Sequence, residues 1–215
     1  MVAIVIPAYN EEHRIGGVLR AALASKLANE VIVVNDASRD NTSAAARAFP
    51  GVKVIDLKHN KGKGGAMAVG VDATKARTIM FLDADLVGLQ AHHIDSIIQP
   101  VMDGNCDMCV GIFRGGKFWS DTAQRISPLY SGQRALKREL FERIPFVSEI
   151  RMGVEVTINA FAKRSNSRVH KVIIRGVSNT HKERKMGVVR GTAARAKMYS
   201  EMYQAIKRTR RNKMR

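Results

Sequence analysis

The sequence predicts an α/β fold with a mostly parallel, Rossmann-like sheet that is covered by helices on both faces. Two observations lead to this prediction. Short apolar runs alternate with segments of helical periodicity along the first 85 residues, and a polar or glycine-rich turn follows each apolar run. Alternation of this kind is typical of parallel sheets. Because ligands of such sheets bind beyond the carboxyl ends of the strands, the turns are the place to look for a site.

The elements of the first half follow from the spacing of their apolar residues. The run VAIVIP ends in turn residues and indicates a buried strand, whereas the apolar residues of 11–25 recur at helical spacing. Cap-type residues open the segment 38–49, and glycines open the segment 62–74. We therefore expect strands at 2–10, 29–36, 52–57 and 78–85, and helices at 11–25, 38–49 and 62–74.

The second half is less regular. Its expected elements are a helix at 92–104, a strand at 106–113, a loop at 114–121, a short strand and then a helix from near Lys137 within 131–145, a helix at 153–165, a strand at 168–177, a basic loop at 179–191 and a helix at 193–212. We see no repeat and no linker. The expected organisation is one domain, 1–191, followed by a basic amphipathic tail, 192–215.

The composition is that of an ordinary globular protein. The chain has 215 residues, of which 45% are hydrophobic and 26% are charged, which is enough to bury a full core. No apolar run approaches the roughly 18 residues that span a membrane, and no basic leader opens the chain, so we expect a cytoplasmic location. Cys106 and Cys109 lack the second pair that a four-cysteine zinc site requires, and we expect core residues.

The net charge of +17 is concentrated at the C-terminus, where residues 181–215 contain twelve lysines and arginines and two glutamates. Met198, Met202 and Ile206 form an apolar stripe there with a cationic end. Either the stripe packs on the domain, or the tail docks on an anionic surface such as the inner membrane leaflet. A nucleic-acid-binding protein is the alternative class. Against it, aromatic residues make up only 6% and no nucleic-acid-binding motif is present.

Four polar turns are expected to meet at one edge of the sheet: PAYNE (7–11), NDAS (35–38), HNKGKGG (59–65) and DAD (83–85). The glycine-rich turn is neither a dinucleotide fingerprint nor a P-loop, because it lacks a third glycine at the required spacing and a G-K-[ST] sequence. Glycines at a helix start let the backbone approach an anion, and Lys61 and Lys63 add positive charge.

Asp83 and Asp85 follow an apolar run, where two like charges cost free energy unless a cation lies nearby. Alternation along an extended segment would point both carboxylates the same way. Carboxylate oxygens are the ligands that a hard divalent cation prefers, and no basic residue close in sequence neutralises them. We therefore expect a positive charge beside this pair, and a hard divalent cation would suit it.

The motifs VIPAYNEE, VIVVNDASRDNT, NKGKGGAM and FLDADL together resemble those of the family 2 glycosyltransferases, in the same order and spacing. The resemblance implies the nucleotide-sugar-binding fold called GT-A, a UDP- or GDP-linked sugar donor, and Mg²⁺ or Mn²⁺ held by Asp83 and Asp85. The nucleotide-sugar site that it implies comprises Pro7, Tyr9, Glu11, Asp36, Lys61, Gly64, Asp83, Ala84 and Asp85. A nucleotidyltransferase can share this sheet architecture, but the PAYNEE opening argues against it.

The second half resembles a narrower set, the enzymes that glycosylate polyprenyl phosphates or phosphoglycerate, through SGQRALKRELF and GVSNTHKERKMG. The resemblance implies that Gln133 and Arg134 lie near the acceptor, that Glu155 contacts the donor sugar and that His181 is a third metal ligand. A phosphate acceptor needs no strong base, because its oxygen is already ionised. For a hydroxyl acceptor and an inverting reaction, Glu149 and Glu155 are the candidate bases.

Overall fold

The computed structural model describes residues 1–114 and 131–179 of the chain. The elements in chain order are β1 (Val2–Ala8), α1 (Ile15–Leu23), β2 (Glu30–Asn35), α2 (Thr42–Arg47), β3 (Val52–Asp56), α3 (Gly62–Asp72), β4 (Thr78–Phe81), β5 (Leu86–Val87), α4 (Ala91–Met102), β6 (Met108–Arg114), β7 (Arg134–Lys137), α6 (Arg138–Glu142), the 3₁₀ helix η2 (Val147–Glu149), α7 (Val154–Arg164), β8 (Val169–Arg175) and β9 (Ser178–Asn179).

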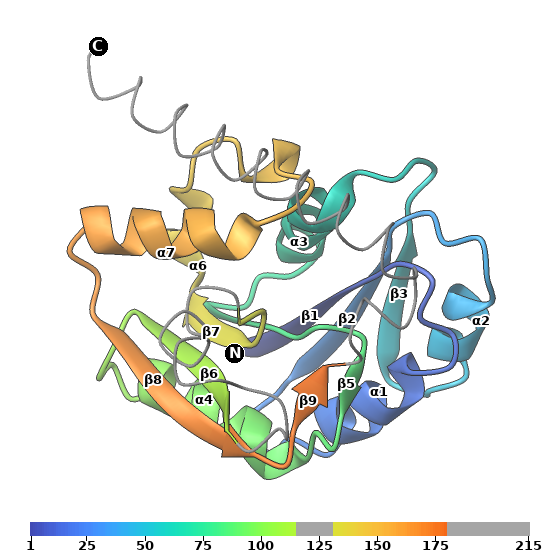
Figure 1. Ribbon diagram of the computed structural model, residues 1–215, viewed down its shortest axis with the longest axis horizontal. Coiled ribbons are helices and arrows are strands. Elements are labelled where there is room, and N and C mark those ends of the chain that lie inside the picture. Colours follow the sequence, from blue (N-terminus) through green and yellow to red (C-terminus); the bar gives the residue numbers. More distant parts are fainter. Residues whose placement is uncertain (115–130, 180–215) are drawn as a thin grey trace.

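Seven of these strands form one sheet in the order β3-β2-β1-β4-β7-β6-β8 (Figure 1). Neighbouring strands are parallel except around β7, which runs antiparallel to both β4 and β6. The predicted mostly parallel α/β sheet is therefore confirmed. The register pairs Ala8 with Asn35, so β1 and β2 end level and the turns that follow them are neighbours.

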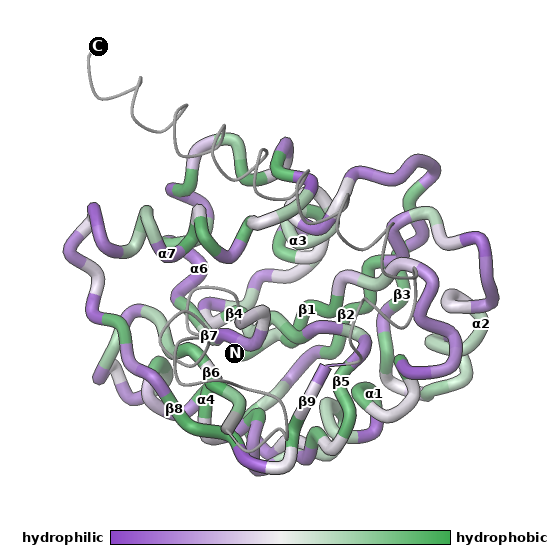
Figure 2. The backbone as a smooth tube through the Cα atoms, viewed as in Figure 1, coloured by the Kyte–Doolittle hydropathy of each residue, from purple (hydrophilic) through white to green (hydrophobic). Residues whose placement is uncertain are grey.

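Helices cover both faces of the sheet (Figure 1). Apolar residues of α1, α2 and α4 belong to one buried cluster, and those of α3, α6 and α7 belong to a second. Hydrophobic residues concentrate in central strands such as β1 and β6 between these layers (Figure 2). Cys106 and Cys109 are free and buried, as expected for core residues. Among the helices described, none is long and apolar enough to cross a membrane.

The main differences from the predicted elements lie at their ends. Helix α1 begins at Ile15 rather than near residue 11, because residues 11–14 form a turn in which the backbone N–H groups of Arg14 and Ile15 both donate to the carbonyl of Glu11. Strand β4 ends at Phe81, whereas the apolar pattern predicted a strand to residue 85. Most of the loop 114–121, nearly all of 179–191 and the helix 193–212 lie outside the described residues.

A second sheet, of two strands, follows the DAD turn directly. Strand β5 pairs antiparallel with β9, with Leu86 opposite Asn179 and Val87 opposite Ser178. Residues 83–85 run directly into β5, so this pairing holds the end of the described chain beside the DAD turn. The apolar and polar pattern contained no signal for this pairing, because each of its strands is only two residues long.

Candidate functional site

The turns after β1 and β2 are joined by hydrogen bonds at the carboxyl edge of the sheet. Asn10, which has a left-handed backbone, donates its N–H to Ser38 Oγ, 3.0 Å away, and accepts the Arg39 N–H on its side-chain oxygen at 2.8 Å. The Glu11 N–H donates to Thr42 Oγ1 at 2.8 Å. Two of the four predicted turns therefore form one unit.

Asp36 links this unit to the third turn. The side chain is only 3% exposed, and its two oxygens accept the backbone N–H groups of Lys61 at 2.6 Å and Gly62 at 2.9 Å. These donors belong to the first turn of α3, where a carboxylate is favourable. Asp36 thus caps α3 from another part of the chain, and this explains its burial better than an open contact with a nucleotide does.

The remaining N-terminal donors of α3 are also satisfied within the protein. The N–H of Lys63 donates to the Arg151 carbonyl and that of Gly64 to the Ile150 carbonyl, both at 2.9 Å. A Cβ at Gly64 would lie 2.4 Å from the Ile150 and Val147 carbonyl oxygens. A helix start has four N–H groups to satisfy, and all four are used here. The backbone N–H groups of this turn are therefore already paired within the protein, two of them with the Asp36 carboxylate, and Gly64 allows close packing against residues 147–150.

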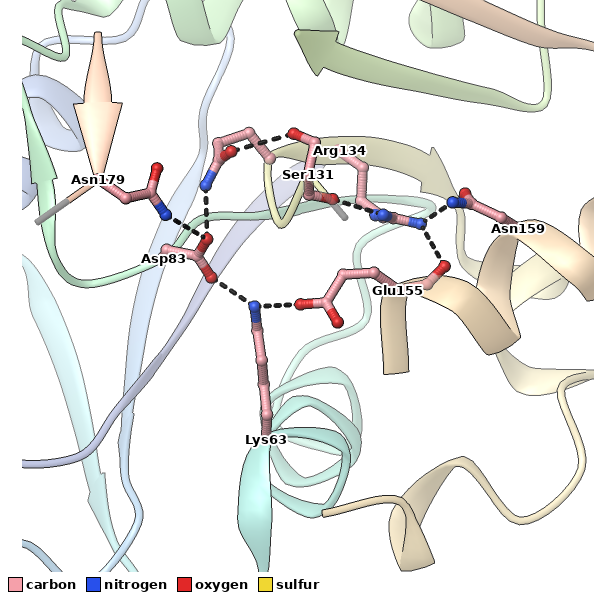
Figure 3. Close-up of polar contacts among 8 residues, drawn as sticks. Lys63, Asp83, Ser131, Arg134, Glu155, Asn159 and Asn179 are labelled. Atoms are coloured by element: carbon pink, nitrogen blue, oxygen red, sulfur yellow. Dashed lines mark hydrogen bonds and ion pairs between the residues drawn. The ribbon is translucent and has the colours of Figure 1, made fainter. Parts of the chain in front are cut away.

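Lys63 joins Asp83 to Glu155 in the cluster of Figure 3. Its Nζ lies 2.5 Å from Asp83 Oδ1 and also donates to Glu155 Oε1. The exposed fractions of the side chains are 28% for Lys63, 16% for Asp83 and 12% for Glu155. One ammonium group thus bridges two carboxylates in a largely buried position, one from the segment after β4 and one from α7.

The charge balance of this cluster favours the protonated lysine. Burial by itself would lower the pKa of Lys63, but the neighbouring carboxylates of Asp83 and Glu155 outweigh it and raise that pKa above its ordinary value. The ammonium is therefore a permanent positive charge at neutral pH. It supplies a cation beside Asp83 that the local sequence did not reveal.

The second carboxylate oxygen of Asp83 also accepts a hydrogen bond. Gln133 Nε2 donates to Asp83 Oδ2 at 2.8 Å, and Ser131 Oγ donates to Gln133 Oε1 at 3.1 Å. Ser131 Oγ also contacts the Gly111 carbonyl of β6. The side chain of Gln133 is completely buried, so it orients Asp83 from the interior.

Arg134 is completely buried and ties β7 to α7. Its guanidinium donates to the Ser131 carbonyl at 2.5 Å, to Asn159 Oδ1 at 3.0 Å and to the Glu155 carbonyl at 3.3 Å (Figure 3). Burial lowers the pKa of Arg134 to about 10, against the opposing effect of Glu155 and Asp83, so it stays charged at neutral pH. Gln133 and Arg134 are therefore both buried and hydrogen-bonded, to Asp83 and to Glu155 respectively, and their place near the acceptor stays a prediction.

The other predicted residues are spread around this cluster. Asp85 is half-buried, and Ala84 is buried with its side chain in the core. Because β4 ends at Phe81 and Asp85 lies in a turn, Asp83 and Asp85 do not belong to one strand, and strand alternation does not align them as the sequence suggested. Tyr9 is 43% exposed just after β1, Lys61 is exposed, and Glu149 is exposed on η2.

The last described residue also contacts Asp83. Asn179 Nδ2 lies 3.4 Å from Asp83 Oδ2, across 96 residues of sequence. His181, two residues further on, lies outside the described residues. Within the part of the chain that is described, no group of three or more His, Cys, Asp and Glu side chains is arranged to hold a metal ion.

Sequence reasoning singled out Lys61 and missed the central role of Lys63. It also assigned no role to Ser131, Gly132, Asn159 and Asn179, although Ser131, Gly132 and Asn179 lie within the quoted motifs. The one available signal was the charge at Asp83, which requires a cation from somewhere in the fold.

Comparisons with known proteins agree on one family. A family model described as Glycosyl transferase family 2 matches residues 3–160. A dolichyl-phosphate beta-glucosyltransferase of Drosophila melanogaster is 35% identical over 99 residues, which cover 39% of this chain and 30% of that protein. A 4,4'-diaponeurosporenoate glycosyltransferase of Staphylococcus aureus is 35% identical over 103 residues, or 46% of this chain and 27% of that protein. The match thus spans less than a third of either curated relative.

The fold itself recurs in a solved structure. Glucosyl-3-phosphoglycerate synthase from Mycobacterium tuberculosis matches with a TM-score of 0.72 and 21% sequence identity, over 91% of this chain and 79% of that chain. The predicted fold class, GT-A, is confirmed by this likeness.

Proposed function

Because the chain belongs to glycosyl transferase family 2, we propose that it moves a sugar from a nucleotide-diphosphate sugar to an acceptor and uses Mg²⁺ or Mn²⁺. One observation carries the proposal. The carboxylates of Asp83 and Glu155 come from distant parts of the chain and meet on one ammonium group beyond the end of β4.

The oxygen ligands of the DAD turn suit a hard divalent cation. Asp83 is already in contact with a positive charge, that of Lys63, so its surroundings accommodate a cation. A bound ion would neutralise charge on the departing nucleoside diphosphate. Solved structures of the mycobacterial synthase contain Mn²⁺ or Mg²⁺ together with UDP, which supports the same pairing in this chain.

His181 is proposed as a further metal ligand. Asn179 contacts Asp83, and two residues span at most about 7 Å between Cα atoms, so the chain leaves the described region close to the DAD turn. Histidine nitrogen is an acceptable ligand for Mn²⁺, and its neighbours Lys182, Arg184 and Lys185 suit phosphate oxygens.

The nucleotide is proposed to bind along the turns after β1 and β2. Tyr9 offers a half-exposed ring there, and Pro7 and Glu11 shape the turn beside it. Asp36 and Lys61 contribute through the start of α3 that they form. UDP is the first nucleotide to test, because the mycobacterial synthase was solved with UDP and with UDP-glucose.

An acceptor with an ionised oxygen fits best. The names of the relatives contain dolichyl phosphate, diaponeurosporenoate and phosphoglycerate, all of which are anions. Such an oxygen needs no general base. Glu155, which is paired with Lys63, then contacts the donor sugar. Gln133 orients Asp83, and Arg134 orients the backbone at Glu155. For a hydroxyl acceptor, exposed Glu149 is the alternative base.

The proposal is tested by titration calorimetry with UDP and GDP, with and without Mn²⁺. We expect Mn²⁺-dependent binding by the native protein, and its loss in both Asp83→Asn and Asp85→Asn while the fold stays intact, as circular dichroism would show. Asp103→Asn, an exposed carboxylate at the end of α4, is the matched control and should bind normally. Equal Mn²⁺-dependent affinity in all variants contradicts the metal site. Salt-sensitive DNA binding without any nucleotide effect would favour the nucleic-acid-binding alternative.

A further inference from the structure

The arrangement around Lys63 raises the question of what its ammonium does when a divalent cation arrives. It occupies Asp83 Oδ1 at 2.5 Å, and Gln133 occupies Asp83 Oδ2 at 2.8 Å. Both oxygens of this carboxylate therefore have donors in the described structure. A metal ion that binds Asp83 must displace at least one of them or share an oxygen with it.

Of these two hydrogen-bond donors, Lys63 is the one that a metal ion at Asp83 displaces. Two positive charges that share one carboxylate oxygen repel each other strongly in a partly buried site. Gln133 is neutral and buried, and Ser131 holds it in place, so it has little reason to move. The lysine has a flexible stem and a half-buried side chain, so it can leave.

Leaving Asp83 is costly unless the ammonium finds other anionic partners. Glu155 is one partner that it already has. The nearby start of α3 offers the ammonium no acceptor, because it presents N–H groups, and these already donate to Asp36 and to the Ile150 and Arg151 carbonyls. An anionic ligand that brings its own phosphate oxygens to the site would supply the missing partner.

We propose that Lys63 is a resident counter-cation that competes with the divalent ion for Asp83, so that the metal enters tightly only together with the diphosphate of the donor. This inference rests on the proposed function and adds to it that the metal ion and the donor bind together. When no donor is bound, the Lys63 ammonium compensates the charge of Asp83. When the donor is bound, the metal ion takes over this role and the diphosphate becomes a partner of Lys63. Thermodynamically, it is a coupling between metal and nucleotide binding that passes through one side chain.

The test measures Mn²⁺ affinity of the full chain by electron paramagnetic resonance, with and without UDP. Removing the charge with Lys63→Met should tighten Mn²⁺ binding in the absence of UDP by on the order of 10-fold to 100-fold. The factor by which UDP improves Mn²⁺ affinity should fall by a similar amount. Lys63→Arg keeps the charge and should retain the weak binding of the native protein.

A matched control separates this effect from a change in net charge. Lys75→Met removes one exposed charge beyond the far end of α3, about 20 Å along the helix direction, and should leave both affinities unchanged. Lys63→Gln keeps a hydrogen-bonding group without charge and replaces the methionine variant if the latter does not fold.

The possible results are distinct. Unchanged Mn²⁺ affinity in folded Lys63→Met or Lys63→Gln, with UDP binding still dependent on Mn²⁺, overturns the competition and leaves the proposed function standing. Tighter Mn²⁺ binding with an undiminished effect of UDP overturns the coupling to the diphosphate. Absence of any Mn²⁺ binding by the native protein, even with UDP, overturns the proposed function together with the inference.

Discussion

Gly132 lies directly against the carboxylate of Asp83: a Cβ at this glycine would stand 2.3 Å from Asp83 Oδ2 and 2.5 Å from Oδ1. A Cβ atom does not approach another heavy atom that closely, so any side chain at position 132 must push the carboxylate away from Lys63 and Gln133. Gly132 and Gln133 are consecutive, and both fix the same carboxylate, one by leaving space and the other by a hydrogen bond.

Gly132→Ala is therefore expected to weaken Mn²⁺-dependent UDP binding by about 10-fold to 100-fold, the usual effect of disturbing a group that orients a metal ligand. Calorimetry measures it. Gly17→Ala is the control, because a Cβ at this exposed glycine of α1 meets nothing within 4 Å. Equal binding by both variants would show that Asp83 can shift without consequence.

Asp36→Ala is expected to destabilise the protein by about 2–3 kcal/mol, because two N–H groups at the start of α3 lose a buried, charged acceptor. Urea unfolding measures the loss. Asp72→Ala removes an exposed carboxylate from the other end of the same helix and should change the free energy of unfolding little. If Asp36→Ala unfolds like the native protein but no longer binds UDP, then Asp36 is a ligand residue and not a cap.

Asp107→Asn is expected to lower stability near pH 7 but not in acid. Hydrogen bonds from Lys137 and the Arg168 backbone lower the pKa of Asp107 from 3.8 to about 2. Because the folded pKa lies below the unfolded one, the stabilisation is present above about pH 4 and is lost as the pH falls toward 2. With partial solvent screening, we expect a difference of about 1–2 kcal/mol at pH 7.

Urea unfolding at pH 7 and pH 3 measures this difference between native protein and variant. Asp103→Asn, whose carboxylate is exposed, should show no such dependence on pH. A gap between Asp107→Asn and the native protein that stays constant from pH 7 to pH 3 would contradict the assignment.

His181→Ala is expected to weaken Mn²⁺ binding in the presence of UDP, because the chain beyond Asn179 starts beside Asp83. Electron paramagnetic resonance of Mn²⁺ measures it. His170→Ala, an exposed histidine of β8, should bind Mn²⁺ as the native protein does. Native affinity in both variants would remove His181 from the metal site.

The basic tail is expected to bind anionic membranes. Five cationic residues lie among the last eight, Arg208 to Arg215, and each contributes on the order of 1 kcal/mol near anionic lipid. In flotation at low salt, the full chain should bind vesicles containing phosphatidylglycerol, whereas a chain ending at Gly191 should not. Vesicles of neutral lipid are the control. Equal behaviour of both chains would exclude the tail as the membrane contact.

Much of the fold could be predicted because its signal is local. Each parallel strand of the first half is a short apolar run, helix α1 has an apolar period of its own, and cap-type residues or glycines mark where the next two helices begin. The approximate position of the site followed from topology, since polar turns after parallel strands share one edge. The element ends were less accurate, because a turn such as 11–14 is decided by backbone hydrogen bonds that the hydropathy pattern does not contain.

The identity of the central cation could not be predicted in this way. Lys61 and Lys63 are two residues apart, so on a helix they point about 200° away from each other. Which of them faces Asp83 depends on how α3 is rotated, and contacts with residues 147–151 decide that rotation. The burial of Arg134 could not be predicted either, because an arginine in a strand is ordinarily exposed. Here its guanidinium is buried and donates to two oxygens of α7.

The span of these contacts has a consequence for how the protein is made. Lys63 meets Glu155 across 92 residues, and Asp83 meets Asn179 across 96. Contacts of such long range form late, because a long loop must first be closed. During synthesis, the strands β1 to β4 can leave the ribosome well before α7, β8 and β9 exist. A partly synthesised chain therefore holds Lys63 and Asp83 without the later partners Gln133, Glu155 and Asn179, and the cluster becomes complete only when the last described strand has paired.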